Sequence, residues 1–126
     1  MKPPQTWLEK AWNKLSAAKE LLLDTDPALD IVLQYAHESA AKALKAFLNS
    51  QGQSFDDSND LVELIEQCAE LDPTFSTLSD PAEDLTVYGI IFRDPEEAEI
   101  IPEKSEAVEA VRLAEVVLEF VAAKIN

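Results

Sequence analysis

The stretch from Pro27 to Gln51 most constrains the fold, because it reads as one long amphipathic helix. Apolar residues recur in it every three or four positions, the spacing of one side of a helix. Asp26 stands where an N-cap belongs, Pro27 suits the first helical position, and Gly52 can end the helix in a left-handed conformation. At ~1.5 Å per residue the stretch is roughly 37 Å long. It therefore predicts a central helix as long as a small domain is wide.

The two sides of this helix differ in character. Its apolar stripe alternates small residues, which let neighbouring helices approach, with large ones, which fill volume: Ala36, Ala40 and Ala43 against Tyr35, Leu44 and Phe47. The other side is polar and carries Gln34, His37, Glu38, Lys42 and Lys45. Glu38 and Lys42 have the spacing of a helical ion pair. We expect a helix packed along one side and in water along the other.

Composition favours a single helical domain spanning residues 1–126. The chain has only two glycines, at 52 and 89, and so lacks a phosphate-cradling glycine loop. Its one cysteine, Cys68, excludes an internal disulfide and points to a reducing compartment. No run of about 18 apolar residues and no signal-peptide core is present. We expect a soluble, cytoplasmic protein with no membrane partner and no cofactor.

Charge is distributed unevenly along the chain. Residues 1–51 hold six Lys and six Asp or Glu, whereas residues 52–126 hold four Lys or Arg against 19 Asp or Glu, which is the whole net charge of −15. Such an acidic surface weakens sequence-independent binding to a phosphate backbone, so DNA is not an expected partner. The acidic half is either a solvated surface, the commoner case, or a surface that attracts a basic partner. Any anion site is expected in the neutral N-terminal half.

Further helices are predicted on both sides of the central one. Thr6 and Glu9 form a capping-box pattern at the start of a helix that ends before Asp24. Another helix covers 61–71, and a last one starts with Ser105 as its cap. Trp7 is expected to be partly exposed, Phe55 to tuck into the core, and Cys68 to be a buried apolar residue rather than a nucleophile.

Residues 74–92 leave two arrangements open. Pro81 disfavours helical geometry at Asp80, so either a short turn precedes a helix capped by Asp80 or one kinked helix runs through. Residues 87–92 have strand-like composition but no partner strand, and are predicted to end a helix. An acidic loop follows at 93–104. The whole pattern predicts an all-α, up-and-down bundle of about five helices.

Few residues suggest chemistry. His37 is the only histidine and has no evident partner in the sequence, so a surface histidine is the commoner explanation. Zinc sites need several His or Cys ligands and are excluded, and no metal is predicted. The acidic loop, with Asp94, Glu96, Glu97 and Glu99, could hold a hard cation weakly but is better explained as a solvated run of charge.

A more specific pattern spans the chain. Residues 35–48 combine Tyr35, Ala-rich turns and Lys42-x-x-Lys45 before Phe47-Leu48. Asn59-Asp60-Leu61 starts the next helix, Arg93-Asp94-Pro95-Glu96 follows the fourth, and the last helix is rich in Glu, Ala and Val. In this order and spacing the chain resembles the HEPN family (higher eukaryotes and prokaryotes nucleotide-binding domains). It departs from that family at Ala41 and Asn59, where Glu and His are common.

The resemblance implies a small nucleotide- or RNA-associated accessory domain, often encoded with a minimal nucleotidyltransferase in toxin–antitoxin, stress or defence systems. Ribonuclease members have an Arg, a polar residue, and a His after four to six intervening positions. Arg93 and Asp94 match the first two, but Ala98, Glu99 and Ile100 stand where the His would be. A non-catalytic role is therefore expected. The alternative is a metal-independent ribonuclease toxin with a degenerate motif, and Arg93 is also suited to a structural ion pair.

Two further expectations follow. A nucleotide phosphate would bind Lys42 and Lys45, with His37 nearby and Arg93 if the fourth helix ends close to them. The alternative is that both lysines only solubilise the helix. A two-fold homodimer is expected because the last helix is apolar on more than one side, and because Trp7, Tyr35 and Phe92 lie near stripe edges. The resemblance implies pairing as well. The dimer interface should use the neutral half and avoid the 94–106 loop.

Overall fold

Helices account for all the regular structure that the computed structural model describes, which covers residues 4–55, 59–91 and 102–125, with residues 4–5 and 87–91 described by their backbone alone. In chain order they are α1 (Pro4–Leu22), α2 (Leu29–Ser50), α3 (Leu61–Leu71), the 3₁₀ helix η1 (Pro73–Leu78), α4 (Ser79–Ile91) and α5 (Lys104–Ile125). No strand occurs in these residues. The predicted all-α bundle of about five helices is confirmed.

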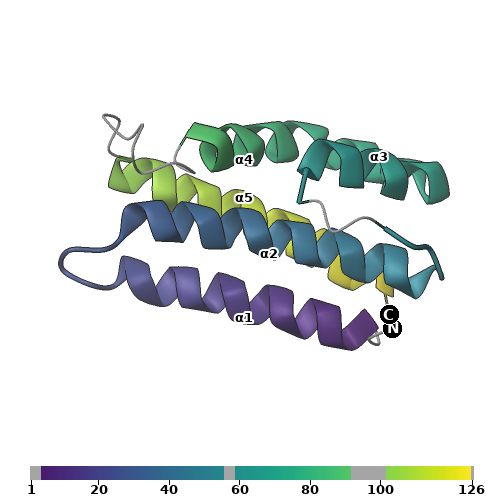
Figure 1. The fold of residues 1–126 in the computed structure, drawn as a ribbon, viewed down its shortest axis with the longest axis horizontal. Coiled ribbons are helices and arrows are strands. Elements are labelled where there is room, and N and C mark those ends of the chain that lie inside the picture. The colour runs from purple at the N-terminus through teal and green to yellow at the C-terminus, as the bar shows by residue number, and fades with distance from the viewer. Residues whose placement is uncertain (1–3, 56–58, 92–101, 126) are drawn as a thin grey trace.

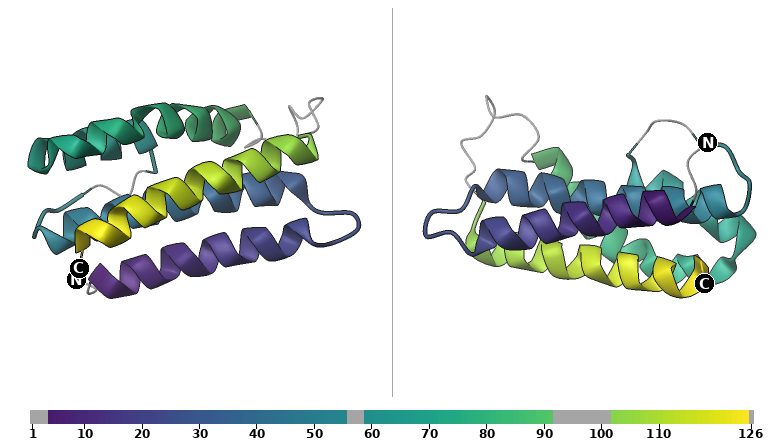
Figure 2. Two further views of the ribbon diagram at one scale, coloured as in Figure 1. Left: turned by 180° about the vertical axis from the view of Figure 1, so that it is seen from behind. Right: turned by 90° about the horizontal axis from the view of Figure 1, so that it is seen from below.

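The helices lie in three layers (Figures 1 and 2). α1 and α2 run antiparallel, joined by the short connection at 23–28. α5 packs beside α2 on its far side and also contacts α1, while α3 and α4 cover the edge of α2 and α5 opposite α1. α2 thus contacts α1, α3, α4 and α5, and the prediction of a central helix is confirmed.

The C-terminal half of α2 is buried on nearly every side. Ser39, Lys45 and Asn49 are buried together with the apolar residues between them. The prediction of a continuous water-facing side is therefore wrong for this half of the helix. The reason is tertiary: α3 and the chain leading to it pack over positions that α1 and α5 do not reach. Ala41 and Ala46 are fully buried in this half, and their small side chains let the neighbouring segments pack closely around α2.

The start of α2 differs from prediction, whereas its end agrees. The helix begins at Leu29, because the Ala28 carbonyl accepts the first hydrogen bonds, from the amides of Ile31 and Val32. Asp26 and Pro27 instead belong to the connection with α1. At the other end the helix stops at Ser50, and Gly52 has φ of +71°, a conformation that suits glycine.

Two other predicted caps are wrong. α1 begins at Pro4, which suits a first helical position, so Thr6 lies inside the helix and cannot form a capping box with Glu9. α5 begins at Lys104, before Ser105. Its N-terminus is held by Glu103, whose carbonyl accepts from the amides of Glu106 and Ala107, while the Glu106 carboxylate accepts from the Glu103 amide at 3.1 Å.

The stretch after α3 combines both arrangements left open by the sequence. A 3₁₀ turn, η1, is capped by Asp72 and continues directly into α4 through the helical residue Ser79. Asp80 lies in the first turn of α4 instead of capping it. The backbone of 87–91 is helical, so the strand-like composition there does end a helix, while Phe92 lies outside the described residues.

The core is built from side chains of all these elements. Phe75 of η1 is fully buried, with ring centroids 4.4 Å from Phe47 of α2 and 5.0 Å from Phe120 of α5. Leu113 and Val117, which widen the apolar stripe of α5, are covered within the bundle. Val108, near the start of α5, is 49% exposed. In the described part of the chain, no helix has the length and apolar character to cross a bilayer.

Candidate anion-binding site

The three candidate residues on α2 occupy different environments. His37 and Lys42 are half-buried, whereas Lys45 is only 4% exposed. Eight residues separate His37 from Lys45, which is about 12 Å along a helix, so one phosphate cannot touch both. The structure therefore does not bring the predicted set together as one site.

Lys45 is used inside the fold. Its Nζ donates a hydrogen bond to Oδ1 of Asn59 at 2.9 Å and lies 5.9 Å from the centroid of the Phe55 ring. Asn59 directly precedes Asp60, the N-cap of α3, which accepts from the amides of Val62 and Glu63. The lysine thus joins α2 to the start of α3. An anion at Lys45, as predicted, would have to compete with Asn59 for the ammonium group.

Phe55 packs against the start of α1. Its ring meets that of Trp7 edge to face, with centroids 5.6 Å apart. The expectations that Phe55 folds back onto the core and that Trp7 is partly exposed are both confirmed. The Nε1 of Trp7 is buried and has no hydrogen-bond acceptor among the described residues. An N–H group in this state costs free energy that a bound acceptor would recover.

Two turns further along α1, an ion pair crosses between the first two helices. Lys14 Nζ lies 3.1 Å from Oε2 of Glu38 and 4.4 Å from the centroid of the Tyr35 ring. The predicted pair between Glu38 and Lys42 is replaced by this one. Lys42 is then left without an ion pair among the described residues.

Most other cations in the described part of the chain are paired with acids. Lys19 of α1 contacts Glu115 of α5, Lys124 contacts Asp72, and Arg112 contacts Glu109 in the next turn back along α5. Like Lys42, Lys104 forms no such pair within the described residues, but it stands exposed at the start of α5. Lys42 is therefore the available cation on the central helix.

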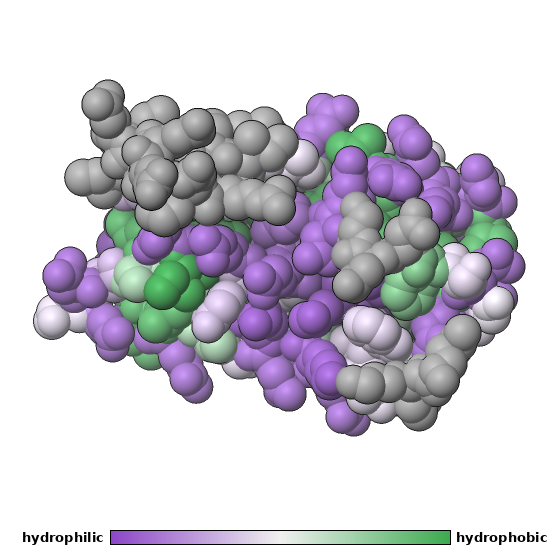
Figure 3. Space-filling view, in the orientation of Figure 1, coloured by the Kyte–Doolittle hydropathy of each residue, from purple (hydrophilic) through white to green (hydrophobic). Residues whose placement is uncertain are grey.

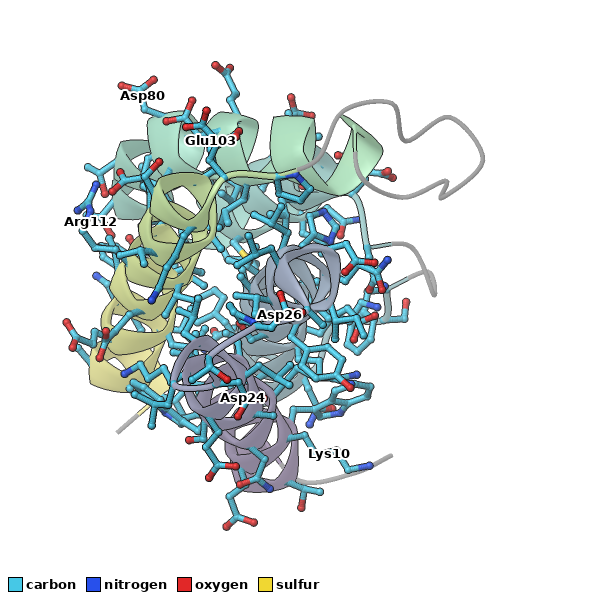
Figure 4. All side chains as sticks on the ribbon, turned by 90° about the vertical axis from the view of Figure 1, so that its left-hand side faces the viewer. Lys10, Asp24, Asp26, Asp80, Glu103 and Arg112 are labelled. Carbon is cyan, nitrogen blue, oxygen red and sulfur yellow. The ribbon has the colours of Figure 1, made fainter. Side chains whose placement is uncertain are left out.

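The face formed by α1 and α2 is hydrophilic in its middle (Figure 3). Figure 3 shows polar residues across the middle of the face that α1 and α2 present to the viewer. In Figure 4, which looks along the bundle from the end with Asp24 and Asp26, Lys10 extends from α1 on the side away from α5. Trp7, Lys10 and Lys14 follow one another at spacings of three and four, which places them on one side of α1.

The remaining predictions about chemistry fall on other parts of the chain. Arg93 and Asp94, like the acidic run that follows them, lie outside the described residues. Within the residues described, no three His, Cys, Asp or Glu side chains are grouped to hold a metal ion. Cys68 is fully buried, its Sγ lies 3.7 Å from the Leu44 carbonyl oxygen, and burial raises the pKa of its thiol to about 12. It is a packing residue, as predicted.

Comparisons with known proteins identify a single family. The sequence model of the HEPN domain family matches residues 4–125. The crystal structure of an archaeal HEPN homologue is similar in fold, with a TM-score of 0.77 at 19% sequence identity, and the match covers 100% of both chains. No curated protein matches the sequence at a significant level.

Proposed function

The chain belongs to the HEPN domain family, and on that premise we propose that it is a non-catalytic accessory module that associates with nucleotides or RNA. The observation that carries this proposal is Lys42, a cation without an ion pair among the described residues, placed in the half of the chain whose charges balance. A phosphate there meets less repulsion than anywhere on the acidic half. The predicted partners His37 and Lys45 contribute only at longer range.

The expected cellular setting is part of the same proposal. The family resemblance supports a minimal nucleotidyltransferase as a protein partner, in a toxin–antitoxin-like, stress or defence system. The buried, unpaired Cys68 suits the reducing cytoplasm. Co-expression with the product of a neighbouring nucleotidyltransferase gene, followed by co-purification, tests this partnership.

Calorimetric titration tests the binding function. ATP and a short RNA, titrated at low salt, should release heat with the wild type and bind more weakly to Lys42→Ala. Lys104→Ala is a matched control, because it removes the same charge from another lysine that forms no ion pair within the described residues. Absence of heat with the wild type, or equal weakening in both variants, would count against a nucleotide-binding role for Lys42.

A ribonuclease activity is the alternative. It rests on Arg93 and Asp94, which supply the first two positions of the family motif in the sequence. Transesterification also needs a base, and the His of that motif is absent. Incubation of the purified protein with tRNA and mRNA in EDTA should leave the RNA intact. Cleavage that disappears in Arg93→Ala would establish the ribonuclease instead.

We also propose a two-fold homodimer. The apolar surplus of α5 supports it less than expected, since Leu113 and Val117 are buried within one chain, although Val108 and Val116 are exposed. Support comes instead from Leu23, 84% exposed, and Ile31, 36% exposed, at the ends of α1 and α2 in the neutral half. Light scattering across a salt series should give a dimer mass that Leu23→Ser with Ile31→Ser reduces. A monomer mass for the wild type at micromolar protein and high salt would disprove it.

A further inference from the structure

α3 is a short helix that packs on the rest of the protein by one side. It contacts α2, η1 and α4, and the buried side chains among its 11 residues are Leu61, Leu64, Ile65 and Cys68. Figure 1 shows it in the outer layer of the bundle, across α2 from α1. Elements with few buried apolar contacts are those that open locally, at a lower free energy than unfolding of the whole domain. α3 therefore has the setting of a segment that can open on its own.

The side of α3 that faces water destabilises the helix. Glu63, Glu66 and Glu70 are exposed, lie three and four residues apart, and form no ion pair within the described part of the chain. Like charges at this spacing repel along a helix, and a carboxylate near the C-terminus also opposes the helix dipole. The last turn of α3 has no basic residue to compensate Glu70. Because so short a helix is marginal without its neighbours, we expect α3 to melt when it leaves α2.

The two ends of α3 are attached in different ways. At the C-terminal end, Asp72 pairs with Lys124 of α5 at 2.9 Å, and the chain continues directly into η1, whose Phe75 is fully buried in the core. At the N-terminal end, Lys45 of α2 donates a hydrogen bond to Asn59 at 2.9 Å. Since η1 fixes the C-terminal end, an opening motion separates the N-terminal end from α2 first. That separation breaks the hydrogen bond of Lys45 to Asn59.

Cys68 lies under α3 and can report the motion. Its side chain is fully buried, and its Sγ lies 3.7 Å from the carbonyl oxygen of Leu44 on α2. A thiol reagent cannot reach a sulfur in this position while α3 is closed. The chain has no other cysteine, so modification of the native protein measures exposure at this one place.

We propose that α3 is a cover on α2 that opens from its N-terminal end while the other helices stay folded. The hydrogen bond of Lys45 to Asn59 and the buried apolar side of α3 hold it closed, whereas repulsion among its exposed carboxylates favours opening. In the open form, Lys45 no longer donates to Asn59, and the thiol of Cys68 meets water. The inference concerns a motion of the fold and does not depend on the proposed nucleotide binding.

Modification of Cys68 by a disulfide reagent in the native, full-length protein tests the cover. When reaction is slower than reclosing, its rate gives the free energy of opening, and its dependence on urea below the unfolding transition reports the surface exposed. Amide hydrogen exchange measures the opening of each helix in the same protein. We expect Cys68 and the amides of α3 to share one free energy of opening, lower than that of α2 and less dependent on urea. Equal values for α3 and α2 would overturn the proposal.

Variants of α3 and its attachment change the rate of modification in opposite directions. Asn59→Ala removes the acceptor for Lys45 and should accelerate modification of Cys68 by about fivefold or more. Asn59→Asp keeps an acceptor oxygen and should react no faster than wild type. Glu66→Gln removes the repulsion with Glu63 and Glu70 and should slow modification by about twofold. Glu119→Gln changes the net charge equally on the exposed side of α5 and should leave the rate unchanged.

Leu15→Val distinguishes opening of α3 from unfolding of the whole domain. Leu15 is fully buried in α1, which packs on α2 and α5, so loss of a methylene there destabilises the closed and open forms alike. Exchange of the α2 amides should rise by about fivefold, while modification of Cys68 stays as in wild type. Equal acceleration of Cys68 modification by Leu15→Val and Asn59→Ala, or an Asn59→Ala variant that reacts like wild type, would show that the proposal is wrong.

Discussion

Lys45 Nζ and Asn59 Oδ1 lie 2.9 Å apart and connect the centre of the fold to the beginning of α3. These residues belong to two separate motifs of the chain, the Lys42-x-x-Lys45 turn and the Asn59-Asp60-Leu61 start of a helix. Their contact gives the second lysine of the turn a structural role. Lys42, three residues earlier, is exposed enough to bind a ligand. We therefore propose that the same short motif holds one lysine for folding and another for binding.

Changing each lysine of the motif to Met separates these roles. Met retains most of the apolar stem and removes the ammonium group, so Lys45→Met loses a charged hydrogen bond from a buried position. We expect its free energy of unfolding to fall by about 1–2 kcal/mol. Lys42→Met should stay within about 0.5 kcal/mol of wild type. Urea unfolding followed by circular dichroism measures both, and equal stability of the two variants would contradict the assignment.

The contact of Trp7 with Phe55 should stabilise the junction of α1 with the α2–α3 connection. Edge-to-face aromatic pairs couple by about 0.5–1.5 kcal/mol beyond the area they bury. A double-mutant cycle with Trp7→Ala and Phe55→Ala measures this coupling from four unfolding curves. A cycle with Trp7→Ala and the distant Val116→Ala, in the exposed part of α5, should give a coupling close to zero.

Asp72 should give the fold a dependence on acid pH. Its carboxylate accepts from the Thr74 hydroxyl at 2.6 Å and pairs with Lys124 at 2.9 Å, and these contacts lower its pKa from 3.8 to about 2. A lowered pKa stabilises the folded state above about pH 4, and that contribution is lost as the pH falls through 2. Asp72→Asn can still cap η1 but cannot pair with Lys124.

The difference in stability between wild type and Asp72→Asn should therefore be largest at neutral pH and shrink between pH 4 and pH 2. Urea unfolding at several pH values measures it. Asp24→Asn is a suitable control, since Asp24 lies on the exposed connection after α1 and forms no ion pair with the described residues. A gap between wild type and Asp72→Asn that is constant with pH would refute the proposed contribution of the ion pair.

Cys68 should be unreactive in the folded protein. Because burial raises its thiol pKa from 9.0 to about 12, the thiolate fraction near pH 8 falls about a thousandfold. Reaction with a disulfide reagent should be correspondingly slow in buffer and fast in denaturant, as measured by absorbance. Fast modification of the native protein would show that α3 opens readily from α2.

The periodicity of apolar residues in the sequence was sufficient to predict the main helices. The bounds of α3 and the glycine at the end of α2 follow from local chemistry that the structure leaves intact. Helix starts were less predictable. Side chains that can cap a helix are present at Asp26, Thr6 and Ser105. A cap changes the free energy of a helix by only about 1 kcal/mol, so the packing of the helix decides at which residue it starts. α2 begins at Leu29, which packs against the core, and α1 begins at Pro4.

The candidate site was only partly predictable, for two physical reasons. The burial of Lys45 depends on where α3 crosses α2, and nothing local to Lys45 encodes this. The pairing of Glu38 with Lys14 instead of Lys42 depends on the register between two helices. The sequence does place a neutral, lysine-bearing half beside an acidic one, and this was enough to locate the candidate surface on α1 and α2.

The uneven charge of these two halves should give the molecule an electric dipole moment. Residues 1–51 form α1 and α2 and carry no net charge, while the −15 belongs to the residues that follow, including α3, α4 and α5. In the field of a polyanion such a body experiences a torque as well as a repulsion. It should turn its acidic layers away and approach with α1 and α2 leading, so that orientation is selected before any contact forms.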